Sequence, residues 1–556
     1  MESKAPGMES GEKAVAIPDN QSNSSDLAPG VMVTGDTDIE NAPIDMSELK
    51  EMNKGLQSRH LQMMALAGAI GTGLFLGSGR AVAQAGPVGA FLGYTLIGFS
   101  AAGVVLAVAE MAALVPLSGG IVRYAEVFVD PALSFANGWN LVYKGLIFIP
   151  TEIVAAAVLM SFWVEVNNAV WITVFGLLMA LTNCLFVRVF GELEFGFALL
   201  KIALIFIVNI MAIVIIAGGG PKGETLGFRY WRDPGPFVQY MGIQGNLGRF
   251  LGFYTTFTNA LYAFSGIENI SLAAAETQNA RHVIPQAAKR VFWRILLFYS
   301  LTMFLVGLVV PSNDDRLLKS TGTAASPFVI SATLAGIKVI PHVINAIVVT
   351  SAWSCGNYGM MSYVGYLFGL AKNGHAPKVV TRLNRFGNPY VAVILFTLFM
   401  ALGYLTVSDG ASTVFTWLQD LLSIAILVNW TVILTTYLRL FYGCKKQAID
   451  RNELPYKSPF QPYFSWGCIT LFVLILITSG WQSFVHGHWN TKSFVSAYFD
   501  IPFVLLLYFG FKFYKKSKII PLDEIPIQAF LDIANADPSP PLKPKRGIRK
   551  LNFLWW

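Results

Sequence analysis

Hydrophobic residues fill most of the chain in long runs, which are separated by short polar segments. An α-helix needs about 20 apolar residues to cross the hydrocarbon core of a bilayer, and many of the runs reach that length. They predict twelve helices, over residues 62–86, 90–115, 132–162, 168–190, 195–217, 253–273, 289–311, 334–368, 390–408, 412–441, 462–483 and 497–514. The pattern therefore predicts an all-α integral membrane protein with twelve transmembrane helices.

Polar segments flank the predicted helices at both ends of the chain. Residues 1–58 are rich in Ser, Asp, Glu and Gly and contain no apolar run, so we expect a disordered tail without a cleavable secretory signal. An even number of spans places both tails on one side. The loops assigned to that side carry more Lys and Arg than the loops opposite, which indicates the cytoplasm. We expect a twelve-helix domain at 59–514 between this tail and a second cytoplasmic tail at 515–556.

Composition and short motifs exclude several function classes. Of 556 residues, 54% are apolar and 13% are charged, whereas charged residues make up about 25% of an ordinary soluble domain. Lys and Arg in cytoplasmic loops explain the net charge of +7, so we expect no nucleic-acid partner. The sequence has no Gly-Lys dipeptide for a phosphate-binding loop and no GxSxG motif, and its four cysteines are scattered without a CxxC. We therefore expect no enzyme activity, no cofactor and no metal site.

Two of the predicted helices contain glycine-rich breaks, and these helices lie five apart in the series. The first carries Gly68, Gly71 and Gly73, and the sixth carries Gly266 beside Glu268. Unpaired backbone groups are tolerated inside a membrane only where they line a cavity or bind a ligand. The spacing predicts two inverted repeats, helices 1–5 and 6–10, with a binding site between the breaks and helices 11 and 12 as accessories. Close helix packing through small residues is the alternative.

Ionisable residues inside membrane spans are costly and mark candidates for function. Six such residues lie in the predicted helices: Glu110, Lys144, Glu152, Lys201, Glu268 and Asp420. Lys201 lies in an otherwise uncharged stretch, where desolvation allows an amine to release its proton. It is therefore predicted to be a proton carrier or a fixed cation, with a structural ion pair as the alternative. We expect Glu110 to pair with a loop cation, while Glu268 is equally suited to holding the unwound backbone and to contacting a ligand.

Four stretches of the sequence form a recognisable set. They are GLQSRHLQMMALAGAIGTGLFLGSG at 55–79, Val-Asp-Pro at 129–131 followed by Gly-Trp-Asn at 138–140, AAAE at 273–276 with PQAAKRVFWR at 285–294, and LPYKSPF at 454–460. Together they resemble the fungal amino-acid permease family of the amino acid–polyamine–organocation superfamily. The resemblance covers about residues 50–520. It implies proton-coupled uptake of amino acids across the plasma membrane by alternating access, through a LeuT-like fold.

The resemblance also implies roles for individual residues. First-helix amides would hold the substrate carboxylate, sixth-helix carbonyls would hold its ammonium, and an aromatic gate would close over the substrate. Lys201 matches the fifth-helix lysine that stands where sodium-driven relatives hold an ion, which gives it the proton-coupling role. The implied substrate-binding residues are Ala69, Ile70, Gly71, Thr72, Gly73, Glu152, Tyr262, Ala263, Phe264, Gly266 and Ser423.

Lys144 and Asp420 depart from the family pattern, because both positions are usually neutral in the family. If both face the pocket they would recognise a charged side chain, and if they face each other or a loop they leave substrate choice unchanged. They are therefore candidates for tuning specificity, and proline-like and broad neutral specificities both stay open.

The expected partners are an amino acid and a proton as transported ligands, the lipid bilayer, and trafficking and ubiquitination machinery at the cytoplasmic tails. A competing function is an amino-acid sensing receptor of the same fold that transports little. The intact glycines at both breaks and the retained Lys201 favour transport, because a receptor needs no proton site.

Overall fold

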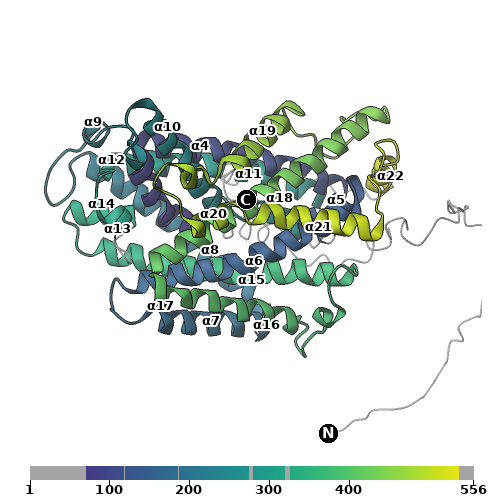
Figure 1. Ribbon diagram of the computed structural model, residues 1–556, viewed down its shortest axis with the longest axis horizontal. Helices are drawn as coiled ribbons and strands as arrows, with labels where there is room; N and C mark the ends of the chain where they lie inside the picture. The colour runs from purple at the N-terminus through teal and green to yellow at the C-terminus, as the bar shows by residue number, and fades with distance from the viewer. Residues whose placement is uncertain (1–70, 118, 186, 275–279, 320–325, 537–556) are drawn as a thin grey trace, which may run out of the picture. The chain divides into compact units, whose positions relative to one another are not determined.

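The computed structural model describes residues 71–117, 119–185, 187–274, 280–319 and 326–536. Every secondary-structure element within these ranges is a helix, which confirms the all-α class (Figure 1). The predicted tail 1–58, together with Ala69 and Ile70 of the first break, lies outside the described residues.

Long helices coincide with most of the predicted spans. They are α4 (Gly77–Leu114), α6 (Pro131–Met160), α7 (Asn168–Leu185), α8 (Val187–Ile216), α10 (Gly245–Ala263), α15 (Ile340–Lys372), α18 (Ala411–Lys446), α19 (Tyr463–Thr478) and α21 (Asp500–Lys515). Shorter α-helices are α3 (Thr72–Phe75), α5 (Ile121–Phe128), α9 (Arg229–Arg232), α11 (Ala280–Arg294), α12 (Leu301–Val309), α13 (Arg316–Lys319), α14 (Pro327–Leu334), α16 (Tyr390–Phe399), α17 (Thr406–Asp409), α20 (Thr491–Tyr498) and α22 (Ile527–Ala536). Tighter or wider turns form η2 (Tyr240–Gly242), η3 (Ile267–Ala274), η4 (Ile295–Ser300), η6 (Lys378–Thr381), η7 (Met400–Leu405) and η8 (Trp481–Phe484).

Five helices of the described residues are long and apolar enough to cross a membrane. They are α4, α6, residues 193–216 of α8, residues 390–409 and residues 413–446 of α18. The pair α20 and α21 makes a sixth if it is counted as one span bent by 42°. Other predicted spans are divided into shorter pieces, such as η4 followed by α12, so helix length alone does not establish the predicted number of twelve.

The predicted boundary between the first two spans coincides with a kink inside α4. Gly86 has φ +78° there and is followed by Pro87. A Cβ at Gly86 would lie 2.7 Å from the carbonyl oxygen of Pro236, which also accepts a hydrogen bond from the amide of Val88. Only glycine combines this backbone conformation with so close an approach, and the kink therefore separates two arms of α4.

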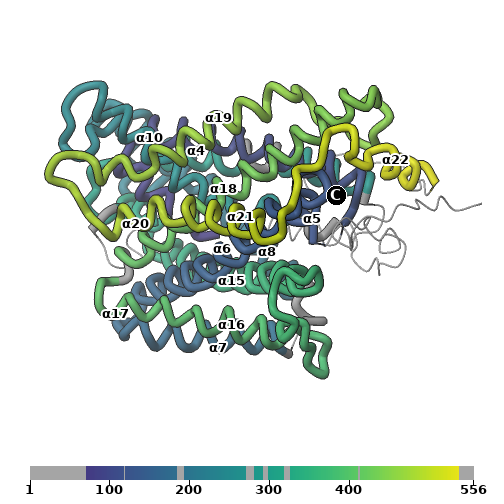
Figure 2. Tube along the Cα trace, turned by 45° about the vertical axis from the view of Figure 1, so that its right-hand side comes forward, coloured from purple at the N-terminus to yellow at the C-terminus, as the bar shows by residue number. Residues whose placement is uncertain are grey.

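Helix α6 is buried along most of its length. This helix packs on α15 and α18, while α4 packs on α10, and α7 lies beside α16 in both views (Figure 1, Figure 2). The helices α7, α8 and α16 expose large apolar side chains: Leu177 is 57% exposed, Ile210 59% and Leu398 66%. Such a surface is unfavourable in water and suits contact with lipid.

The segment after α21 returns over the junction between α5 and α6. The amide of Ile520 donates to the carbonyl of Val129 at 2.9 Å, and Ser517 Oγ donates to the carboxylate of Asp130 at 3.3 Å. Farther along, the ring of Phe530 in α22 packs edge-on against Phe128 at 6.3 Å between centroids. Part of the predicted tail 515–556 is therefore folded onto the helices.

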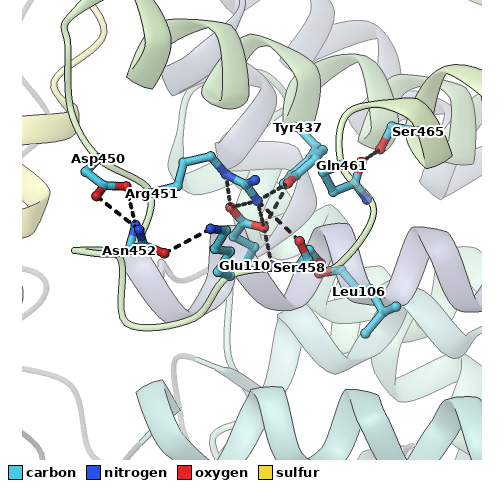
Figure 3. A network of polar contacts seen from close by, with 10 residues as sticks. Leu106, Glu110, Tyr437, Asp450, Arg451, Asn452, Ser458, Gln461 and Ser465 are labelled. Carbon is cyan, nitrogen blue, oxygen red and sulfur yellow. Dashed lines mark hydrogen bonds and ion pairs between the residues drawn. The ribbon is translucent and has the colours of Figure 1, made fainter.

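An ion-pair network fixes the far end of α4 (Figure 3). Glu110 is 1% exposed and accepts from Nη2 of Arg451, which follows α18, at 2.8 Å. The hydroxyl of Tyr437 and the amide of Ser458 donate to the same carboxylate at 2.8 and 2.7 Å. The expected pairing of Glu110 with a loop cation is confirmed, and the network holds the LPYKSPF segment against α4.

We expect Arg451→Met to destabilise the protein, because it leaves the buried Glu110 carboxylate without its cation. Removing one partner of a buried pair costs about 3–5 kcal/mol, and the donors that remain place the loss near the lower value. Thermal unfolding of purified protein in detergent measures the change. Lys457→Met is the matched control, since Lys457 lies in the same loop and donates an exposed hydrogen bond to Asn452. Equal unfolding temperatures for the two variants would contradict the assignment.

Candidate functional site

The two predicted breaks meet in direct backbone contact. Gly71 is extended before the single turn of α3, and Gly266 has φ +89° between α10 and η3. A Cβ added to Gly73 would lie 2.4 Å from Cα of Ala263, the last residue of α10. The glycine therefore lets the first and sixth segments approach more closely than any other residue would allow.

Hydroxyl groups from neighbouring segments satisfy carbonyls that the breaks leave open. The hydroxyl of Tyr94 donates to the carbonyl of Gly73 at 3.3 Å, and that of Tyr299 donates to the carbonyl of Ala263 at 3.2 Å. The ring of Phe264 is fully buried and packs on Tyr299 at 4.5 Å and on Tyr94 at 6.4 Å. Phe264 thus supports the tyrosines that hold the two breaks in place.

A buried polar cluster lies where the breaks meet α6. Thr72 donates from Oγ1 to both carboxylate oxygens of Glu152 at 3.1 Å, and Tyr262 donates to Oε1 at 2.9 Å. The two hydroxyls also contact each other, and all three side chains are at most 3% exposed. The cluster, here called the Thr72–Glu152–Tyr262 triad, joins the first, third and sixth predicted spans at one carboxylate.

Lys201 faces a carboxylate that the sequence interpretation missed. Its Nζ lies 3.8 Å from Oε1 of Glu194, and Oγ of Ser354 donates to the two oxygens of Glu194 at 2.8 and 3.0 Å. Glu194 precedes Lys201 by seven residues, which is about two helical turns on one face. That spacing was the available signal, but the predicted span began at residue 195 and left Glu194 in a loop.

Helix α15 links this pair to the triad. A Cβ at Gly71 would lie 2.9 Å from Sγ of Cys355 and 3.6 Å from Oε1 of Glu152. Cys355 directly follows Ser354, whose hydroxyl binds Glu194. One turn of α15 therefore touches the first break through Cys355 and the Lys201–Glu194 pair through the residue before it, Ser354.

Lys144 pairs with Glu268 in the interior. The Lys144 Nζ lies 2.5 Å from Oε1 of Glu268, and both side chains are at most 1% exposed. Asn429 and Trp430 of α18 each donate to the same carboxylate at 3.3 Å. The pair ties α6 and α18 to η3, just past the sixth-span break.

Asp420 and Ser423 of α18 have different surroundings. A carboxylate oxygen of Asp420 lies 3.7 Å from Nη1 of Arg80, and the two side chains are 24% and 21% exposed. Ser423 is buried and donates to the carbonyls of Thr258 and Gln419 at 2.9 and 2.8 Å. Lys144 and Asp420 therefore do not face each other, and each has its own counter-ion.

Known proteins resemble the chain over most of its length. Residues 60–522 match the family described as Amino acid permease. The dicarboxylic amino acid permease of Saccharomyces cerevisiae is 35% identical over 499 residues, covering 88% of this chain and 82% of the relative. The proline-specific permease of that yeast is 37% identical over 519 residues, covering 90% and 82%. A general amino-acid permease of Candida albicans is 37% identical over 479 residues, covering 85% and 80%.

A solved transporter structure shares the fold. The manganese transporter of Eremococcus coleocola, in complex with an aromatic bis-isothiourea substituted compound, aligns with a TM-score of 0.55 and 12% sequence identity. The alignment covers 87% of this chain and 99% of that chain. At this identity the likeness speaks for the fold alone, and it confirms the expected LeuT-like architecture.

We expect Gly73→Ala to abolish substrate binding and to destabilise the protein by about 1–3 kcal/mol, because the new methyl group meets backbone that has no room to move. Gly77→Ala is the matched control: its Cβ would find Tyr94 Oη at 3.6 Å, an ordinary contact distance. Thermal unfolding and binding of labelled amino acid to purified protein measure both effects. Similar behaviour of the two variants would show that the close contact is unimportant.

Proposed function

The chain belongs to the amino acid permease family, and on that premise we propose that it is a secondary active transporter that takes up amino acids with protons by alternating access. The observation that carries this proposal is the meeting of two broken helices at a buried carboxylate. Broken helices supply backbone donors and acceptors together, and a free amino acid needs both.

The substrate site lies at the two breaks. Amides at Gly71, Thr72 and Gly73 have no partner within so short a helix and are positioned for the substrate carboxylate. We assign Ala69 and Ile70, which precede them in the first predicted span, to the same carboxylate-binding segment.

The substrate ammonium binds near Glu152, together with carbonyls at Ala263, Phe264 and Gly266. In the present arrangement the hydroxyls of Thr72 and Tyr262 occupy the Glu152 carboxylate. An ammonium ion takes over those acceptor positions at little cost, because it offers charge-assisted hydrogen bonds in return. Tyr262 then closes over the bound substrate.

Lys201 carries the coupling proton. Its side chain is 1% exposed. The charged form therefore needs acceptors or a counter-ion from neighbouring residues, whereas the neutral amine needs fewer such partners. Protonation favours the conformation that holds α8 close to the first break, and release of the proton loosens it. Differential affinities of about 1–3 kcal/mol suffice to couple two sites in this way.

Substrate choice depends on α18 and on Arg80. Relatives named for different substrates are similarly related to this chain, so the family alone does not determine which amino acid is transported. The partly exposed Arg80–Asp420 pair is available to a charged substrate, whereas Ser423 shapes the site through backbone contacts. Lys144 acts indirectly, since it positions Glu268 beside the break.

The spans cross the plasma membrane with both termini in the cytoplasm, where the tails bind trafficking and ubiquitination machinery. The excess of Lys and Arg in the loops on that side supports this orientation. A sensing receptor of the same fold is the alternative, and it would bind amino acids without net uptake.

We expect Lys201→Met to abolish accumulation against a gradient, because the thioether keeps the volume of the side chain and carries no proton. Exchange of internal for external amino acid should persist, since it needs no net proton movement. Substrate-induced proton influx into reconstituted vesicles measures the coupling, with Lys378→Met at the exposed start of η6 as the control. Normal proton influx per substrate in Lys201→Met would place the coupling elsewhere, with Glu152 as the next candidate.

We expect Asp420→Asn to shift preference towards acidic amino acids, because Arg80 loses its counter-ion. A change of about fivefold in the competition order corresponds to about 1 kcal/mol, a usual value for a partly exposed pair. Uptake competition with all twenty amino acids measures it, and Arg80→Gln should shift the order the other way. A uniform loss of uptake with the order unchanged would contradict the assignment.

A further inference from the structure

We propose that Glu194 accepts the proton from Lys201 and releases it at the side of the membrane where α8 begins. The inference rests on the proposed proton coupling and adds its exit route. Glu194 is 2% exposed, and Ser354, which holds it, is fully buried. Within the described residues, neither Glu194 nor Ser354 forms a hydrogen bond with the Thr72–Glu152–Tyr262 triad. We therefore assign these two residues a role other than holding substrate.

The carboxylate of Glu194 has few donors for so buried a charge. Within the described part of the chain, one hydroxyl and the Lys201 ammonium, 3.8 Å away, are its partners. A carboxylate with four acceptor positions needs more than this to offset its desolvation, whereas a neutral carboxyl needs much less.

The transfer step conserves atoms and charge. One N–H bond of the Lys201 ammonium breaks and one O–H bond forms on Oε1 of Glu194, which turns an ion pair into an amine and a carboxylic acid. The acid then gives its proton to water and becomes a carboxylate again. The 3.8 Å separation exceeds hydrogen-bond length, so a rotamer change of the flexible lysine precedes the transfer.

The position of Glu194 along α8 sets the direction of the route. It lies two turns, or about 10 Å along the axis, nearer to Val187 at the start of the helix than Lys201 does. In the proposed orientation that end of α8 faces the cytoplasm. A proton that moves from Lys201 to Glu194 has therefore moved inward.

Ser354 gives the substrate a way to influence this step. Its hydroxyl holds Glu194, and the adjoining Cys355 lies against Gly71 at the first break. A shift of the first segment on substrate release therefore displaces the turn of α15 that holds the proton acceptor. Because packed interiors transmit small displacements, the two events become linked.

Among the side chains that the structure describes, the titratable groups that face Glu194 are Lys201 on its own helix and Cys355 and Tyr358 on α15. Lys201 also faces Glu152 of α6. The helices α12 and α14 also pack on α8 and carry no titratable side chain, and α7 carries only Cys184. Because substitution of Glu194 leaves these other groups in place, a change in pH dependence in the variant reports on the loss of the Glu194 carboxyl group.

The test uses the full chain in proteoliposomes with an imposed proton gradient. Glu194→Gln should lower gradient-driven uptake and proton influx at least tenfold, while exchange of amino acid across the membrane stays within twofold of the wild type. Glu194→Asp, which keeps the carboxyl group, should recover part of the proton influx. A Glu194→Gln variant with wild-type proton influx per substrate would overturn the relay.

A second substitution covers the case in which Glu194→Gln does not fold. Ser354→Ala removes a donor to the carboxylate, so Glu194 should hold its proton more tightly and need a higher internal pH to release it. The dependence of uptake on internal pH should move upward by about 0.5 pH unit or more. An unchanged dependence in Ser354→Ala would overturn the relay.

The wild-type chain separates this inference from the function on which it rests. If the wild type moves no protons with substrate, proton coupling fails and the relay fails with it. If the wild type moves protons and Lys201→Met does not, while Glu194→Gln moves them normally, the coupling stands and only the exit route is overturned.

Discussion

The first and sixth segments touch backbone to backbone, with Gly73 against Ala263, and the other features of the site follow from that contact. The contact brings Thr72 and Tyr262 within reach of one carboxylate on α6, Glu152. The two helices are interrupted next to each other. Tyr94 and Tyr299 from neighbouring segments donate hydrogen bonds to backbone carbonyls at these interruptions. A larger residue than glycine at position 73 would separate the two breaks and disperse the polar groups around them.

Buried ion pairs in this protein join helices and segments that are far apart in the sequence. Glu110 joins α4 to the segment after α18, and Lys144 joins α6 to η3 through Glu268. Buried pairs of this kind add little net stability compared with well-packed apolar residues, but they are costly to break. They therefore penalise every arrangement in which the partner is displaced. The triad carboxylate of Glu152 differs, because its donors here are neutral hydroxyls that a ligand can replace.

Much of the fold could be predicted because it depends on local pattern. Apolar runs located most helices within a few residues, the boundary at residue 86 coincides with the positive φ of Gly86, and the two glycine-rich breaks are real interruptions. The pairing of Glu268 with Lys144 could not be predicted, since these residues are far apart in sequence and no periodic pattern relates them. Glu194 was missed for a different reason. Its helix starts earlier than its apolar run, because a buried ion pair and Ser354 compensate the polar residue there.

The contacts of the segment after α21 affect the order in which the parts of the protein pack together during synthesis. Ile520 and Ser517 supply hydrogen bonds to Val129 and Asp130, which the ribosome adds long before them. During synthesis, the carbonyl of Val129 and the carboxylate of Asp130 lack the hydrogen bonds from Ile520 and Ser517 until those residues are added. The helices around them can insert and pack before that point. A nascent chain that stops after α21 would contain its long helices, and Tyr508 and Lys512 of α21 could already bind Asp130, but the carbonyl of Val129 would lack the amide of Ile520. The hydrogen bonds of this segment with Val129 and Asp130 can therefore form only after α21 has been synthesised.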